Sequence, residues 1–157
     1  MTDSQSDAKR YAFRLLAYRG RSESELRERL TRKGFPGEAI SFAVDYLKKA
    51  GYLDDRVLAE NLKRQVLEKK MLGYQGAKVF MAKRGLPTEV VEATLDYDED
   101  RELQNVHKLV DKKLVSMGNY LTKNEKRRLW NFLARRGYSS GIIRKALKAM
   151  SLSEEED

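Results

Sequence analysis

The sequence has no cysteine, a single histidine and only two prolines. The lack of cysteine excludes disulfide bonds, thiolate metal sites and cysteine nucleophiles. With no cysteine and with His107 as the one histidine, we expect neither a zinc site nor a Ser-His triad. There is also no apolar run of the roughly 18 residues that a membrane-spanning helix needs, and the segment 1–7 is polar. We therefore expect a soluble cytoplasmic protein that is not an enzyme and uses no cofactor or metal.

What the sequence does contain is an excess of basic residues. Against 24 aspartates and glutamates stand 32 lysines and arginines, which give a formal net charge of +8 over 157 residues. A surface with this charge favours phosphate backbones or acidic proteins as partners. Hydrophobic residues make up 41% of the chain, enough to form a folded core.

A pattern of a basic residue, a glycine, a bulky residue and a helix start occurs three times. The copies are Lys33-Gly34-Phe35-Pro36, Arg84-Gly85-Leu86-Pro87 and Arg136-Gly137-Tyr138-Ser139, spaced 51 and 52 residues apart. A period of this size is typical of repeat proteins, in which stacked helical units bury faces that no unit could bury alone. Such arrays usually present a long surface to an extended partner.

The spacing of apolar residues predicts three helices in each repeat. In the first repeat Ile40, Ala43, Val44 and Leu47 follow at helical intervals. Ser22 with Glu25, and Thr122 with Glu125, have the spacing of helix-capping boxes. We expect positive φ at Gly34, Gly85 and Gly137, because a left-handed glycine commonly ends a helix.

Since no long segment alternates with period two, we expect an all-α fold, an elongated array of three tandem three-helix repeats. The repeats span residues 8–53, 54–96 and 97–150, between a disordered polar tail at 1–7 and an acidic tail at 151–157. Two well-capped terminal repeats with acidic tails predict a monomer.

Charge is concentrated in the first and third repeats, which carry +6 and +7, whereas the middle repeat carries +1. The basic residues of the second helix of each repeat would form a stripe if the repeats stack in register. Guanidinium groups on such a stripe match the geometry of phosphates and carboxylates. The candidate binding residues are Arg27, Arg29, Arg32, Lys33, Lys78, Lys83, Arg84, Arg127, Arg128, Arg135 and Arg136.

Other features have structural explanations. His107 borders an apolar stripe and is expected to be a half-buried packing residue. Asp54 and Asp55 open a helix, so N-capping explains them better than paired catalytic carboxylates do. The glycine-rich segment 73–76 could hold an anion at a helix start, although it lacks the spacing of a phosphate-binding loop. We expect the aromatic residues, including Trp130, Phe132 and Tyr138, to pack between helices.

Three segments resemble a known family. Gly51-Tyr52-Leu53-Asp54-Asp55, the basic segment from Gly73 to Gly85, and Phe132-Leu133-Ala134-Arg135-Arg136-Gly137-Tyr138 are similar to the bacterial RecX family of recombination regulators. The resemblance covers about residues 8–150, in order. It departs at Ala77, Lys78 and Val79, where the family often has more arginine.

The resemblance implies a non-enzymatic modulator of the RecA recombinase, built as a stack of three-helix repeats. Such proteins lie in the groove of the filament of RecA and single-stranded DNA, and block its growth or destabilise it. In this way they restrain strand exchange and the coprotease activity of the filament in the SOS response. The implied partners are the RecA filament and single-stranded DNA, the latter contacted directly or through RecA.

Two alternatives remain open. The first is a helical repeat protein that binds nucleic acid without sequence preference and without RecA. Repeats that read one base each carry near-identical residues at their reading positions. Here the position five residues before each glycine holds Arg29, Phe80 and Phe132 in turn, and this difference argues against a base-by-base code. The second alternative is a helical scaffold for a peptide, which predicts an apolar groove in place of a basic one.

Overall fold

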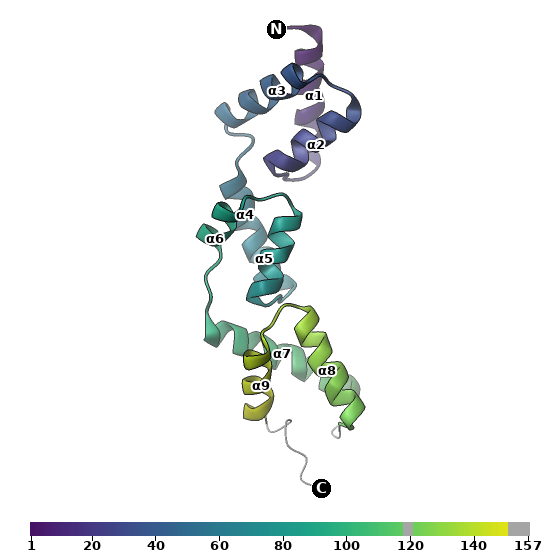
Figure 1. Ribbon diagram of the computed structural model, residues 1–157, viewed down its shortest axis with the longest axis vertical. Helices are drawn as coiled ribbons and strands as arrows, with labels where there is room; N and C mark the ends of the chain where they lie inside the picture. Colours follow the sequence, from purple (N-terminus) through teal and green to yellow (C-terminus); the bar gives the residue numbers. More distant parts are fainter. Residues whose placement is uncertain (118–120, 151–157) are drawn as a thin grey trace. The chain divides into compact units, whose positions relative to one another are not determined.

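The structure is a computed structural model that describes residues 1–117 and 121–150, and within these ranges it contains helices and no strand (Figure 1). The prediction of an all-α fold is confirmed. The acidic tail expected at 151–157 lies outside the described residues. The α-helices are α1 (Asp3–Tyr18), α2 (Glu23–Lys33), α3 (Gly37–Lys49), α4 (Asp55–Arg64), α5 (Tyr74–Lys83), α6 (Thr88–Thr94), α7 (Glu99–Met117), α8 (Lys123–Arg135) and α9 (Ser140–Ala149), and a turn of π-helix, η1 (Gln65–Lys69), follows α4 directly.

By its contacts the chain forms two compact units, which are described separately. The first unit contains Met1–Lys63 and Phe80–Thr94, and the second contains Arg64–Val79 and the described residues from Leu95 onward. Residues 54–96, which we assign to the middle repeat, therefore contribute to both units. The division into three repeats at the boundaries given above stays a prediction.

In the first unit α1, α2 and α3 enclose one core. The most extensive contact is between α1 and α3, and α2 packs against both, as Figure 1 shows. Leu26 and Leu30 of α2 and Val44 and Leu47 of α3 are fully buried. The two residues of α3 lie at the helical spacing expected from the sequence.

The first helix begins earlier than the sequence analysis predicted. Residues 3–7, which we expected to be disordered, form the first turns of α1, because Thr2 and Gln5 make a capping box. The Thr2 hydroxyl accepts from the Gln5 amide at 3.1 Å, and the Gln5 side chain accepts from the Thr2 amide at 2.9 Å. These bonds satisfy two amide groups that would otherwise be free at the helix start.

In the second unit α7, α8 and α9 enclose a second core, to which Val106 and Val110, Leu129 and Leu133, and Ile143 and Ala146 contribute. The predicted glycine caps are confirmed in both units, with φ of 96° at Gly34, 81° at Gly85 and 91° at Gly137. The Ser22–Glu25 capping box is also confirmed, and the Thr122 hydroxyl accepts from the Glu125 amide.

Candidate functional site

The predicted basic residues of α2 lie mostly on the surface of the first unit. Arg29, Arg32 and Lys33 are exposed, and Arg27 is half-buried. Two of them are paired along the helix: Arg32 with Glu28 at 2.5 Å and Arg27 with Glu23 at 3.4 Å. Exposed pairs of this kind contribute little to stability and exchange readily for another anion. These side chains therefore remain available to a partner.

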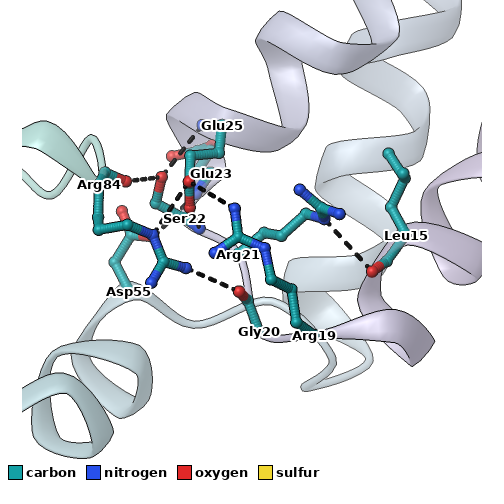
Figure 2. A network of polar contacts seen from close by, with 9 residues as sticks. All are labelled: Leu15, Arg19, Gly20, Arg21, Ser22, Glu23, Glu25, Asp55 and Arg84. Atoms are coloured by element: carbon teal, nitrogen blue, oxygen red, sulfur yellow. Dashed lines mark hydrogen bonds and ion pairs between the residues drawn. The ribbon is translucent and has the colours of Figure 1, made fainter. Parts of the chain in front are cut away.

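Arg84 of the same predicted set has a different position. Its side chain is only 17% exposed and its Nε donates to Glu25 Oε2 at 3.1 Å, while its Nη2 donates to the Gly20 carbonyl at 2.9 Å (Figure 2). The Arg84 carbonyl in turn accepts from the Ser22 hydroxyl at 2.5 Å. Arg84 thus joins the end of α5 to the start of α2. Its guanidinium is bonded to Glu25 and Gly20 of its own unit, which makes it a structural residue.

The start of α2 is the centre of this polar network. Arg19 Nη2 also donates to Glu25 Oε2 at 3.4 Å, and Asp55 accepts a hydrogen bond from the Glu23 amide at 2.9 Å. Burial raises the pKa of Glu25, but its bonds with Arg84 and the Ser22 amide outweigh burial and leave the pKa below its ordinary value. The Glu25 carboxylate is therefore held in its charged form.

The two aspartates after Leu53 act as caps and not as a catalytic pair. Asp54 accepts from the Arg56 amide at 2.9 Å at the start of α4, whereas Asp55 reaches back to the amide of Glu23 at the start of α2. Burial raises the pKa of Asp55. The capping role was predicted for both residues, but the sequence did not show that Asp55 caps a different helix.

In the second unit Arg127, Arg128 and Arg135 of α8 are exposed. Arg136 is half-buried, donates to the Lys70 carbonyl, and places its guanidinium 5.2 Å from the centre of the Phe132 ring. Arg136 therefore plays a structural part in its unit, as Arg84 does in the other. Lys78 is half-buried with its Nζ 5.3 Å from the centre of the Tyr74 ring.

The segment 73–76 is packed against the turn that ends α8. The Gly73 amide donates to the Arg136 carbonyl at 2.8 Å, and a Cβ on Gly76 would overlap that carbonyl. The next amide of the helix start, that of Tyr74, donates to Glu102 Oε1 at 2.7 Å. A carboxylate of the protein itself therefore occupies the position that the sequence analysis considered for an anion.

Glu102 was missed by the sequence analysis. It is 2% exposed, its Oε2 has no hydrogen-bond partner within residues 1–117 and 121–150, and burial raises its pKa. A charged residue beside Arg101 on a helix of mixed polarity gives no sign of burial, so its partner could not be found from the sequence.

The expectation for the aromatic residues is partly wrong. Tyr138 is buried, and Trp130 and Phe132 pack on the core of the second unit, as predicted. His107 is half-buried, also as predicted. Tyr46 and Tyr52, however, are 40% and 61% exposed on the first unit.

The exposed cations of the predicted set fall into two groups, one in each unit. They are Arg29, Arg32, Lys33 and Lys83 in the first unit, and Arg127, Arg128 and Arg135 in the second.

Among residues 1–117 and 121–150 no group of three or more acidic or histidine side chains is arranged to hold a metal ion. No helix in that part of the chain is long and apolar enough to cross a membrane.

Comparison with known proteins finds one family by sequence and the same fold among solved structures. Residues 8–55 match the model of the first three-helix domain of RecX, and residues 99–147 match that of the third. A regulatory protein RecX of Thermus thermophilus is 35% identical over 153 residues, which cover 96% of this chain and 95% of the relative. A regulatory protein RecX of Amycolatopsis mediterranei is 34% identical over 142 residues, with coverage of 90% and 81%.

Two solved structures have the same fold. The crystal structure of RecX from Lactobacillus salivarius superposes with a TM-score of 0.83 at 20% identity, covering 97% of this chain and 99% of that one. A second crystal structure, of a regulatory protein RecX, has a TM-score of 0.77 at 18% identity and covers 93% and 72%. With two family domains matched and relatives similar along most of their length, this chain belongs to the RecX family.

Proposed function

We propose that this protein binds the filament of RecA and single-stranded DNA and restrains RecA recombinase and coprotease activity, without catalysing a reaction. The observation that carries the proposal is membership of the RecX family, whose relatives are regulatory proteins. The partner and the direction of control come from the family resemblance of the sequence.

The positions of the basic side chains refine the proposed contact. Arg84 and Arg136 are bonded within their own units, so they are removed from the set that touches the filament. The remaining exposed cations lie on α2 and the end of α5 in the first unit and on α8 in the second. The filament offers phosphates and carboxylates at regular intervals, and both match guanidinium groups.

Contacts at two separate groups of cations strengthen each other. Once one group is bound, the second binds from a high effective concentration, so loss of either group weakens binding by more than its own contacts. The distribution of charge, +6 in residues 8–53 and +7 in residues 97–150 against +1 between them, supports two contacts of similar importance.

The test is the DNA-dependent ATPase of RecA, measured with increasing amounts of the purified protein. We expect inhibition at amounts at or below one molecule per RecA protomer, and loss of that inhibition when Arg127 and Arg128 are both changed to alanine. An ATPase rate that does not change at stoichiometric protein would refute the proposal. If the protein then still bound DNA, the alternative of a nucleic-acid-binding protein that works without RecA would replace it.

A further inference from the structure

The first unit carries a group of aromatic side chains that its core does not bury. Phe13 of α1 lies between Tyr46 of α3 and Tyr52 of the turn that follows α3. The centre of its ring is 6.3 Å from that of Tyr46 and 5.0 Å from that of Tyr52, with both pairs edge-to-face. Because Tyr46 is 40% and Tyr52 is 61% exposed, part of each ring lies at the surface.

Cations accompany these rings. Lys9, one turn before Phe13 on α1, places its Nζ 3.7 Å from the centre of the Tyr46 ring. Lys49 is exposed and lies three residues after Tyr46, and residues at this interval share a helix face. The aspartate before Tyr46, Asp45, points about 100° away from it around the helix. The aromatic face, defined here as Lys9, Phe13, Tyr46, Lys49 and Tyr52, is therefore bordered by positive charge.

A hollow of about 150 Å³ opens beside Tyr52. Its walls include the apolar side chains of Leu16, Val57 and Leu58 and the buried Arg21. The carboxylate of Asp54, which also borders the hollow, already accepts from the Arg56 amide. A flat apolar group in this hollow would contact the Tyr52 ring and the apolar side chains of the walls.

We propose that the aromatic face binds single-stranded nucleic acid directly, with unpaired bases stacked on Tyr46 and Tyr52 and phosphates near Lys9 and Lys49. Exposed aromatic rings beside cations are the combination by which proteins hold single strands without reading sequence. A duplex does not suit this face, because its bases are covered by their neighbours in the stack. The α2 and α8 cations recognise charge alone, so this site is of a different kind from theirs.

The inference extends the proposed function, but its test needs no RecA. Binding of the full-length protein to fluorescently labelled oligothymidylate is measured by anisotropy, beside an oligomer of abasic sites of the same length. We expect the native protein to prefer oligothymidylate. Changing Tyr46→Ala and Tyr52→Ala together should weaken that binding by about tenfold or more, the size of one good stacking contact. Affinity for the abasic oligomer should not change, which also shows that the fold is intact.

Two further variants separate stacking from other effects. Tyr46→Phe with Tyr52→Phe should keep the affinity for oligothymidylate, because the rings remain. Tyr18→Ala is the matched control: Tyr18 is 82% exposed on α1, about 140° around the helix from Phe13, and its loss should have no effect. Equal binding of abasic and thymidylate oligomers by the native protein would overturn the proposal. So would a double alanine variant that keeps its affinity for oligothymidylate but no longer binds the RecA filament, since the face would then bind protein. Failure of RecA inhibition alone would leave this inference standing.

Discussion

Replacing Arg84 with alanine should destabilise the first unit, although Arg84 has the appearance of a surface binding residue in the sequence. The substitution removes the side-chain bonds to Glu25 Oε2 at 3.1 Å and to the Gly20 carbonyl at 2.9 Å. It keeps the bond from the Ser22 hydroxyl, because that bond ends on the Arg84 backbone. The loss is therefore confined to the guanidinium.

The expected loss is about 2 kcal/mol. Hydrogen bonds to charged groups contribute about 1.5–3 kcal/mol, whereas exposed ion pairs contribute about 0–1 kcal/mol. The side chains of Arg84 and Glu25 are 17% and 18% exposed, so the pair lies nearer the first case. Arg19, at 3.4 Å, still partly compensates the Glu25 carboxylate, which keeps the loss below that of a fully buried pair.

Urea unfolding followed by circular dichroism measures the free energy, and hydrogen exchange at the amides of Ser22 and Glu25 locates the effect at the start of α2. The matched control is Arg32→Ala, which removes an exposed pair with Glu28 and should cost about 0.5 kcal/mol or less. A double-mutant cycle with Glu25→Gln should give a coupling energy of about 1 kcal/mol or more. If Arg84→Ala costs no more than Arg32→Ala, the structural role argued for Arg84 is wrong.

Three other predictions concern both units. Gly34→Ala should cost about 1 kcal/mol from the positive φ alone, since no atom of the residues that the structure describes lies within 4 Å of the added Cβ. Gly137→Ala should cost clearly more, because its Cβ would overlap the backbone of Gly76. Equal losses in thermal unfolding, read for Gly137 from Trp130 fluorescence, would contradict the close packing. Acid should act on Glu25 and Glu102 in opposite directions. The lowered pKa of Glu25 means that its contribution is present above its ordinary value of 4.5 and is lost as pH falls further. The raised pKa of Glu102 means that its contribution is present below 4.5 and is lost as pH rises through the higher folded value, so Glu102→Gln should reduce the gain in stability on moving from pH 7 towards 4.5. Urea midpoints across this range test both signs. Finally, Arg29→Ala with Arg32→Ala should relieve RecA ATPase inhibition about as strongly as Arg127→Ala with Arg128→Ala, and Lys83→Ala should have a milder effect. A larger effect of Lys83→Ala would mean that the contact of the first unit is centred on the end of α5 and not on α2.

The features that the sequence predicted well are those that depend on neighbouring residues. Apolar spacing placed the buried face of α3, and the positive φ values of Gly34, Gly85 and Gly137 followed from their places after helices. The early start of α1 could also have been predicted, because Thr2-Asp3-Ser4-Gln5 has the capping-box spacing.

The features that it did not predict depend on residues far apart in the chain. Ser22 and Arg84 are 62 positions apart, and Arg136 and Lys70 are 66 apart. In the sequence Arg84 and Arg135 both appear as basic residues beside a helix end, yet one is bonded within the fold and the other is exposed. Only the packing of distant segments distinguishes a structural arginine from one that is free to bind a partner.

The contribution of Phe80–Thr94 to the first unit affects how the protein forms during synthesis. The ribosome synthesises the whole of α1, α2 and α3 before Arg84, which comes 62 positions after Ser22. At about 5–20 residues per second, the start of α2 waits roughly 3–12 s for the guanidinium that neutralises Glu25. A nascent chain stalled before Arg84 should therefore hold a first unit that is less stable than the finished one, and an expression fragment of this unit is better ended after Thr94 than at the end of the first repeat.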